Sequence, residues 1–217
     1  MTARDDILGA IRAARATPAR TAEAIAAEAA SLLDAPETTR PGLAPAAGDL
    51  ADAFARKAGA LGTTIEHLPD IAAIPAALRR YLDTHGLPAS LAVQPAAEFA
   101  GLDWGGVAIH RDLAPDEPAA LGLALCGIAE SGSLVVHSGP DAPVLLSFLP
   151  LHHIVVLRVD TLLPHLEDYA ALMAKQASPR NAILITGPSG TTDIEGSYVR
   201  GAHGPGFLHV ILTRSTD

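Results

Sequence analysis

The chain of 217 residues contains a single cysteine, Cys126. One cysteine excludes an internal disulfide, and it excludes a zinc cage or an iron–sulfur cluster held by several cysteines of this chain. The surrounding string "LGLALCG" is apolar, so we expect Cys126 to be buried as a small hydrophobic residue.

Aromatic residues and basic runs are also scarce. Aromatics make up 4% of the chain, the net charge is −9, and no run of Lys and Arg occurs. Because nucleic-acid binders present basic patches to the phosphates, this balance argues against a nucleic-acid partner. No apolar stretch reaches the roughly 20 residues of a membrane span. The acidic opening, with Asp5 and Asp6, lacks the apolar centre of a signal peptide, so we expect a soluble, cytoplasmic protein.

What the chain does contain is apolar segments of alternating type. Hydrophobic residues make up 49% of the sequence. Residues 1–34 are expected to form a helical arm of two helices, with Thr2 and Thr21 as N-caps, and residues 35–48 a linker rich in Pro, Gly and Thr. In residues 49–217, strand-like runs at 63–68, 90–94, 106–110, 121–126, 133–138, 153–159, 181–186 and 207–213 alternate with helical stretches, one of them at 142–150. This pattern predicts an α/β domain with helices layered on a mostly parallel sheet.

A glycine-rich segment follows the run "NAILIT". In "LITGPSGTTDIEG" (184–196), Gly187 and Gly190 permit a tight turn, and Ser189 and Thr191 add hydroxyl groups. We expect this segment at the carboxyl end of the sheet, where its amides would hold a small carboxylate or phosphate. It carries neither a Walker nor a dinucleotide motif. The acids that follow are interpreted as a proton-handling or cation-binding pair, or as a helix cap and loop residue: Asp193 and Glu195.

A second candidate is the turn "GIAESGS" (127–133). Glu130 is either an exposed turn residue or a desolvated general acid, base or nucleophile, with Ser131 beside it. Among the nine histidines, His203 lies in the glycine-rich "GAHGPG" with Gly204 and is interpreted as a donor to an anionic ligand. The adjacent His152 and His153 cannot both face one ion in an extended strand, and no metal-ligand spacing occurs, so no metal site is expected.

The motifs "GIAESGS", "LPLHHIVVL" and "GPSGTTDIEGSYVRGAHGPGFLHVIL" together resemble the lactate-utilization protein C family, which carries the LUD domain. The resemblance extends over residues 49–217. It implies a three-layer α/β/α sandwich similar to the superfamily of ribose-phosphate isomerase, glucosamine-phosphate deaminase and CoA-transferase. It also implies a part in oxidising L-lactate to pyruvate, together with partner proteins that hold the iron–sulfur clusters.

Three hypotheses follow from these residues and this resemblance. The first is a non-redox subunit of a lactate-utilization complex that binds a small anionic ligand and holds no cofactor itself. The second is an autonomous enzyme of the sugar-phosphate isomerase or CoA-transferase type that uses Glu130. The third is a metabolite sensor without chemistry of its own.

Overall fold

The computed structural model describes residues 3–14, 20–34, 49–192 and 196–214. The chain divides into two compact units, residues 1–40 and 41–217. The first unit contains helices α1 (Ala3–Ala14) and α2 (Ala22–Asp34). The Ala24 N–H donates to Thr21 Oγ1 over 3.2 Å, which confirms the predicted cap of α2. The other predicted cap, Thr2, lies outside the described residues.

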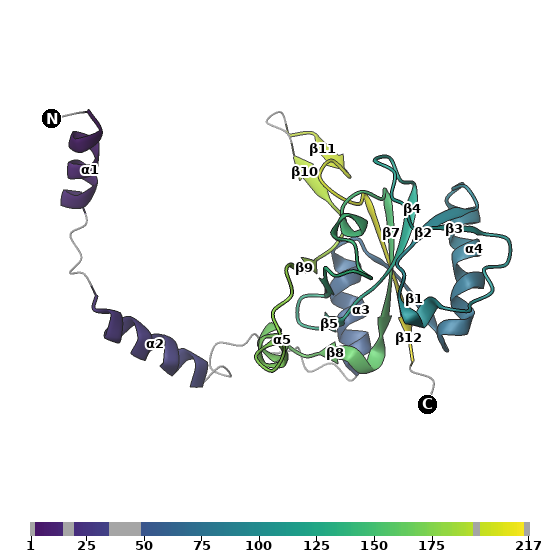
Figure 1. The fold of residues 1–217 in the computed structure, drawn as a ribbon, viewed down its shortest axis with the longest axis horizontal. Coiled ribbons are helices and arrows are strands. Elements are labelled where there is room, and N and C mark those ends of the chain that lie inside the picture. Colours follow the sequence, from purple (N-terminus) through teal and green to yellow (C-terminus); the bar gives the residue numbers. More distant parts are fainter. Residues whose placement is uncertain (1–2, 15–19, 35–48, 193–195, 215–217) are drawn as a thin grey trace. The chain divides into compact units, whose positions relative to one another are not determined.

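The second unit is built on a six-stranded sheet in the order β1-β12-β7-β4-β2-β3, which crosses the centre of Figure 1. All five strand pairs of this sheet are parallel. The strands are β1 (Thr64–Leu68), β2 (Ser90–Val93), β3 (Ala108–His110), β4 (Ala119–Leu123), β7 (His152–Arg158) and β12 (Phe207–Thr213). The predicted α/β class with a mostly parallel sheet is therefore confirmed.

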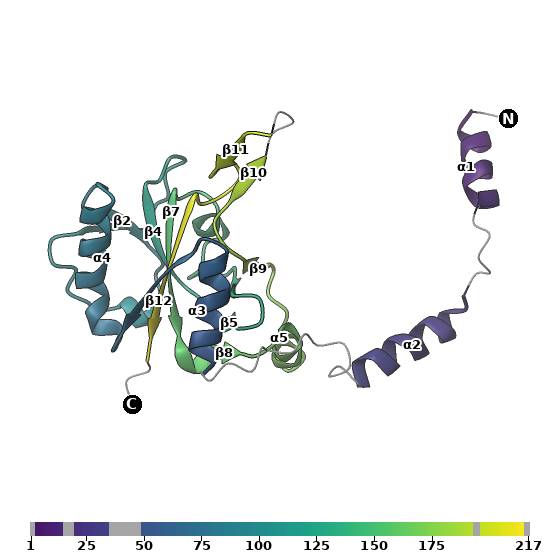
Figure 2. The same cartoon turned by 180° about the vertical axis from the view of Figure 1, so that it is seen from behind.

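Helices cover both faces of this sheet, as Figures 1 and 2 show for α3 (Leu50–Ala60) and α4 (Ile74–Thr84). Alternate residues of β7 point to opposite faces, because the side-chain period of a strand is two. Ile154 packs in the core under α4, and Val155 packs in the core under α3. The strand is consequently apolar on both faces, as its continuous β-branched run predicts.

A second sheet of four strands was not predicted. It has the order β8-β5-β6-β9, and only its β5–β8 pair is parallel. The strands are β5 (Cys126–Ile128), β6 (Ser133–His137), β8 (Leu162–Leu163) and β9 (Ala182–Ile185). Leu134 and Leu162 of this sheet share a core with Phe54 of α3, so the layer on that face combines a helix and a sheet.

The remaining elements are short. The stretch expected to be helical at 142–150 forms only the 3₁₀ turn η4 (Val144–Ser147), and further single 3₁₀ turns are η2 (Ile71–Ala73), η3 (Ala97–Phe99) and η5 (Val159–Thr161). Helix α5 (Leu166–Met173) precedes β9, and the hairpin β10 (Gly190–Thr192) and β11 (Tyr198–Arg200) precedes β12. Within the described ranges, no helix combines the length and the apolar character that a bilayer crossing requires.

Candidate functional site

The glycine-rich segment lies at the amino ends of the main strands, so the prediction that placed it at their carboxyl ends is wrong. The Ser189 N–H donates to the Pro205 carbonyl (2.7 Å), and the Gly201 N–H donates to the Ser189 carbonyl (2.9 Å). Pro205 leads directly into β12, whose first residue, Phe207, donates its N–H to the Leu151 carbonyl just before β7. The prediction failed because β9, which precedes the segment, pairs with β6 in the second sheet.

The predicted ligand residues of this segment are largely engaged in packing. Gly187 has a φ of +85°, and a Cβ there would lie 3.1 Å from Leu61 Cβ. Gly190 lies directly under the Tyr198 ring and could not accommodate a Cβ. Thr191 is half-buried in the middle of β10. Two further predicted ligand residues lie outside the described part of the chain: Asp193 and Glu195.

A groove of about 520 Å³ contains two of the predicted residues, His203 and Gly204. Its other lining residues are Pro115, Asp116, Glu117, Phe148, Leu149, Leu151, Gly201 and Ala202. Ser189 lies behind it, because a Cβ on Gly204 would meet Ser189 Cβ at 3.4 Å. We call these lining residues the amino-end groove. Its wall carries the imidazole of His203 and the carboxylate of Asp116, so it is not a simple anion site. Glu117 is buried, and its carboxylate contacts the Ala114 N–H and His110.

Glu130 is held at the start of α5. Its Oε1 accepts a hydrogen bond from the Leu166 N–H at 2.8 Å, and its Oε2 is buried with no hydrogen-bond partner among the described residues. The next residue, Ser131, contacts the Ser133 hydroxyl at 2.8 Å, which in turn contacts the Thr186 hydroxyl at 2.8 Å. The structure thus joins Ser131 to the start of the glycine-rich segment, but Glu130 does not line the amino-end groove.

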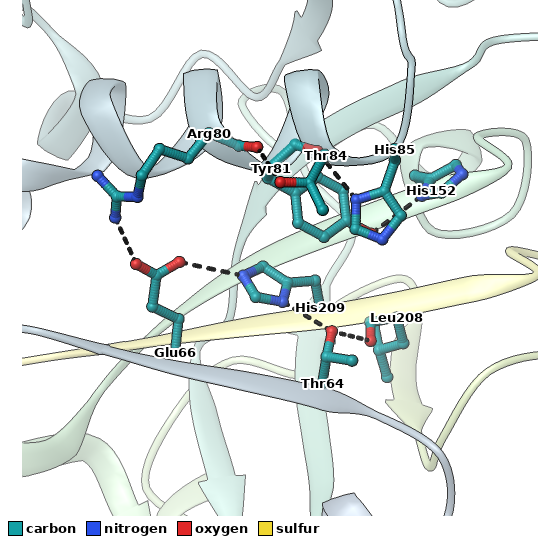
Figure 3. A network of polar contacts seen from close by, with 9 residues as sticks. All are labelled: Thr64, Glu66, Arg80, Tyr81, Thr84, His85, His152, Leu208 and His209. Atoms are coloured by element: carbon teal, nitrogen blue, oxygen red, sulfur yellow. Dashed lines mark hydrogen bonds and ion pairs between the residues drawn. The ribbon is translucent and has the colours of Figure 1, made fainter.

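Three histidines lie around Tyr81 in a cluster that no sequence motif predicted (Figure 3). The Tyr81 hydroxyl and His152 Nδ1 are 2.9 Å apart. The Tyr81 ring stacks on His85 with centroids 4.1 Å apart and lies 4.6 Å from the His209 ring. We call these four residues the histidine cluster. Tyr81 and His85 come from the end of α4, His152 from the start of β7 and His209 from β12. Because these residues are far apart in the sequence, no local spacing predicts the cluster.

His209 joins this cluster to a charged pair at the sheet edge (Figure 3). Glu66 binds Arg80 Nη2 at 2.6 Å and places its Oε2 3.6 Å from His209 Nε2. On the other side, His209 Nδ1 lies 2.7 Å from the Thr64 hydroxyl, which donates to the Leu208 carbonyl. Nε2 is the ring nitrogen that faces the Glu66 carboxylate. Burial lowers the pKa of His209, and the Glu66 carboxylate opposes that shift.

Tyr81 and His152 are neutral at physiological pH. Burial, with a smaller contribution from His85, lowers the pKa of His152 to about 4. Burial alone raises the pKa of Tyr81 to about 12. The cluster adjoins the amino-end groove, because Leu151 lines the groove and the next residue, His152, stacks on Phe207 with ring centroids 4.3 Å apart. The His152 end of the cluster therefore lies beside the groove.

Two other candidate side chains, His153 and Cys126, lie apart from the histidine cluster. His153 points to the face opposite His152, fully buried beside Gly122 and Gln94. Burial raises the pKa of the Cys126 thiol to about 11, and the side chain is buried as predicted. Among the described residues, no three His, Cys, Asp or Glu side chains are arranged to hold a metal ion.

Comparison with known families finds similarity to one domain family. Residues 111–213 match the model of the LUD domain, a stretch just under half of the chain that contains the amino-end groove, β7 and β12. A lactate utilization protein C of Geobacillus sp. (strain WCH70) is 34% identical over 109 residues, which cover 47% of this chain and 45% of that protein. A lactate utilization protein C of Geobacillus kaustophilus is 31% identical over 129 residues, covering 56% and 54%. These similarities support the LUD-domain family.

Two further matches complete the comparison. An uncharacterized protein of Neisseria meningitidis serogroup B is 37% identical over 92 residues, covering 41% of this chain and 39% of that protein. The matched stretches thus span about half or less of each curated relative. The crystal structure of a DUF162 family protein from Deinococcus radiodurans shares the fold, with a TM-score of 0.55 and 22% identity over 80% of this chain and 99% of that one.

Proposed function

We propose that this chain serves the oxidation of L-lactate to pyruvate as a cytoplasmic subunit that holds no redox centre of its own. The similarity of its LUD domain to lactate utilization proteins C carries this proposal. The reaction removes two electrons and two protons from the hydroxyl-bearing carbon and its oxygen. Iron–sulfur clusters of partner proteins accept the electrons.

The single cysteine of the chain supports the proposal that partner proteins hold the iron–sulfur clusters. An iron–sulfur cluster is commonly held by four cysteine thiolates, whereas this chain has one cysteine. Cys126 is buried in β5, and its raised pKa keeps it in the thiol form. A buried thiol is a poor ligand, since the thiolate is the form that binds metal.

The amino-end groove supports a ligand with both a carboxylate and a hydroxyl. The exposed His203 ring is a donor on the groove wall, and the exposed Asp116 carboxylate is an acceptor. A 2-hydroxy acid satisfies both groups: its carboxylate accepts from His203, and its hydroxyl donates to Asp116. A ligand with only anionic oxygens is repelled by the acidic wall.

The rim of the same groove supports contact with a partner protein. Phe148 is 45% exposed and Leu151 is 47% exposed, although both are large and apolar. Tyr198 and Val199 of the nearby hairpin are also exposed. Contiguous exposed apolar side chains are typical of protein–protein contacts.

Co-purification tests the proposal. The tagged chain, expressed in its own host, is expected to retain iron–sulfur proteins, identified by mass spectrometry and by their visible absorbance. Phe148→Asp should reduce their recovery, whereas Asp141→Asn, a change at an exposed position outside the groove, should not. If the wild-type chain retains no iron–sulfur protein under any growth condition, including growth on lactate, the subunit proposal is wrong.

One observation favours a second candidate, an autonomous acyl- or sugar-phosphate-converting enzyme. Glu130 Oε2 is buried without a partner among the described residues, and such a carboxylate oxygen is available as a base or nucleophile. Assay of the purified protein against sugar phosphates and acyl-CoA donors tests this candidate. Turnover that Glu130→Gln abolishes would support it, and absence of turnover in the wild type would remove it.

A further inference from the structure

The direction in which the main sheet grows reverses between β2 and β4. From β2 the chain continues outward to β3 at one edge, whereas β4 lies on the other side of β2 and leads through β7 to β12. In open parallel sheets, the crevice beyond the carboxyl ends of strands at such a reversal is a preferred ligand site. The glycine-rich segment does not occupy this end, since it lies at the amino ends of β7 and β12.

The structure has a crevice of about 340 Å³ beside this reversal, within the volume range of small-molecule sites. Its walls come from residues at the ends of β2 and β3 and from the loop between these strands. We call it the switch crevice, and its lining includes Gln94, Phe99, Trp104, Ile109 and Arg111.

Gln94 lies at the edge of the switch crevice, and one hydrogen bond orients its carboxamide. Only 8% of this residue is exposed, and its Oε1 accepts a hydrogen bond from the Leu123 N–H at the end of β4 (2.9 Å). Since only the amide oxygen can accept, this bond fixes which end of the carboxamide is Nε2. Nε2 has no hydrogen-bond partner among the described residues, and it is not one of their fully buried polar atoms. The carboxamide lies beside Gly122 and His153.

Arg111 supplies a positive charge at the same crevice. It follows the last residue of β3 and is exposed, and no described acid pairs with it. An arginine guanidinium binds carboxylates through two parallel hydrogen bonds. Its position immediately after the strand places this charge at the same end of the sheet as Gln94.

Aromatic side chains form the other wall. Phe99 is buried and meets Trp104 edge to face, with ring centroids 6.4 Å apart and an interplanar angle of 73°. Ile109 adds an aliphatic surface. These side chains suit the flat or apolar body of a ligand rather than a second charge.

We propose that the switch crevice is a binding site for a monocarboxylate with a flat apolar body, whose carboxylate is bound by Arg111 and whose body lies against Trp104. This site is separate from the amino-end groove, and it stands whether or not the chain serves lactate oxidation. Lactate and pyruvate carry only a methyl group as apolar body, so they are expected to bind more weakly here.

Tryptophan fluorescence tests this proposal directly, because Trp104 is the only tryptophan of the chain. The full-length protein is titrated with benzoate up to ~10 mM, a range that covers millimolar affinity, at constant ionic strength. We expect a saturable change in fluorescence. Benzamide, which has the same shape without the charge, should bind at least tenfold more weakly.

Two variants separate the site from general effects. Arg111→Gln should weaken benzoate binding at least tenfold. Arg79→Gln, which removes an exposed arginine paired with Asp83 on the surface of α4, should leave it unchanged. The proposal is wrong if benzoate produces no saturable change in the wild type, or if Arg111→Gln binds it as tightly as the wild type does. None of these outcomes depends on growth on lactate or on recovery of iron–sulfur partners.

Discussion

The carboxylate of Glu130 accepts a hydrogen bond from the backbone N–H of Leu166, 2.8 Å away, at the first residue of α5. A helix N-terminus carries unsatisfied N–H groups and a partial positive charge, so a carboxylate there stabilises the helix. This contact gives Glu130 a structural role that the sequence did not indicate. Catalysis and capping by this residue can be separated by two substitutions.

Glu130→Ala removes this contact with the start of α5 and is expected to lower the free energy of unfolding by ~1 kcal/mol. Glu130→Gln keeps an acceptor oxygen for Leu166 and should cost less than Glu130→Ala. Urea unfolding followed by circular dichroism measures both. Equal losses for the two variants would contradict the capping role.

Gly132→Ala is expected to destabilise the domain strongly. Gly132 has a φ of +68°, and a Cβ there would lie 2.8 Å from Ala58 Cα in the backbone of α3. Backbone strain and overpacking together should cost more than ~2 kcal/mol. Gly139→Ala is the matched control, since nothing lies within 4 Å of its Cβ position. Thermal unfolding should show a clear loss for the first variant only, and similar midpoints would refute the packing argument.

Acid should weaken the fold through His153. This side chain is buried with both ring nitrogens unpartnered among the described residues, and burial lowers its pKa to about 4. In the unfolded chain the ring has a pKa of about 6.5, so between these values only the unfolded state takes up the proton. Stability present above pH 6.5 is therefore lost as the pH falls toward 4, by up to ~1.4 kcal/mol per pH unit.

His153→Phe tests this origin of the acid sensitivity. The variant should show a shallower dependence of the unfolding free energy on pH between 6.5 and 4, with a residual slope from His152, whose pKa is also lowered. His203→Gln, at an exposed position, serves as the control. An unchanged slope in His153→Phe would assign the acid sensitivity to other groups.

Tyr81→Phe probes the histidine cluster. The substitution removes the hydroxyl that contacts His152 Nδ1 at 2.9 Å and leaves that nitrogen without this partner. Because both residues are buried, we expect a loss of ~1–3 kcal/mol in the free energy of unfolding. Tyr198→Phe, at a ring that is 62% exposed, should be nearly neutral. A neutral Tyr81→Phe would show that the contact contributes nothing to stability.

The fold was largely predictable because its strands carry local signals. The β-branched run at 153–159 predicted β7 within one residue, and Thr21 predicted the start of α2. Which of the two larger sheets a given strand joins was not predictable in the same way. "NAILIT" has the composition of a central strand, but β9 pairs with β6, some fifty residues earlier, and pairing over that separation leaves no local pattern. The helix expected at 142–150 is only a short turn between Pro143 and Pro150, since proline interrupts helices.

The candidate site was predicted in part. His203 and Gly204 do share a groove, and Ser189 lies against Gly204. Two acids line the same groove, Asp116 and Glu117. The sequence did not indicate them, because they precede β4 and lie far from Ser189 and His203 along the chain. The histidine cluster was not predicted for the same reason, because its residues come together only when α4 packs on the sheet.

Growth on L-lactate tests the central claim most directly. A strain that lacks this gene is compared with its parent on L-lactate and on pyruvate as sole carbon source, with the wild-type gene and Phe148→Asp supplied in trans. The account predicts that the deletion abolishes growth on L-lactate but not on pyruvate, that the wild type restores it, and that Phe148→Asp restores it poorly. Growth of the deletion strain on L-lactate at the parental rate, with no other copy of the gene present, would contradict the account.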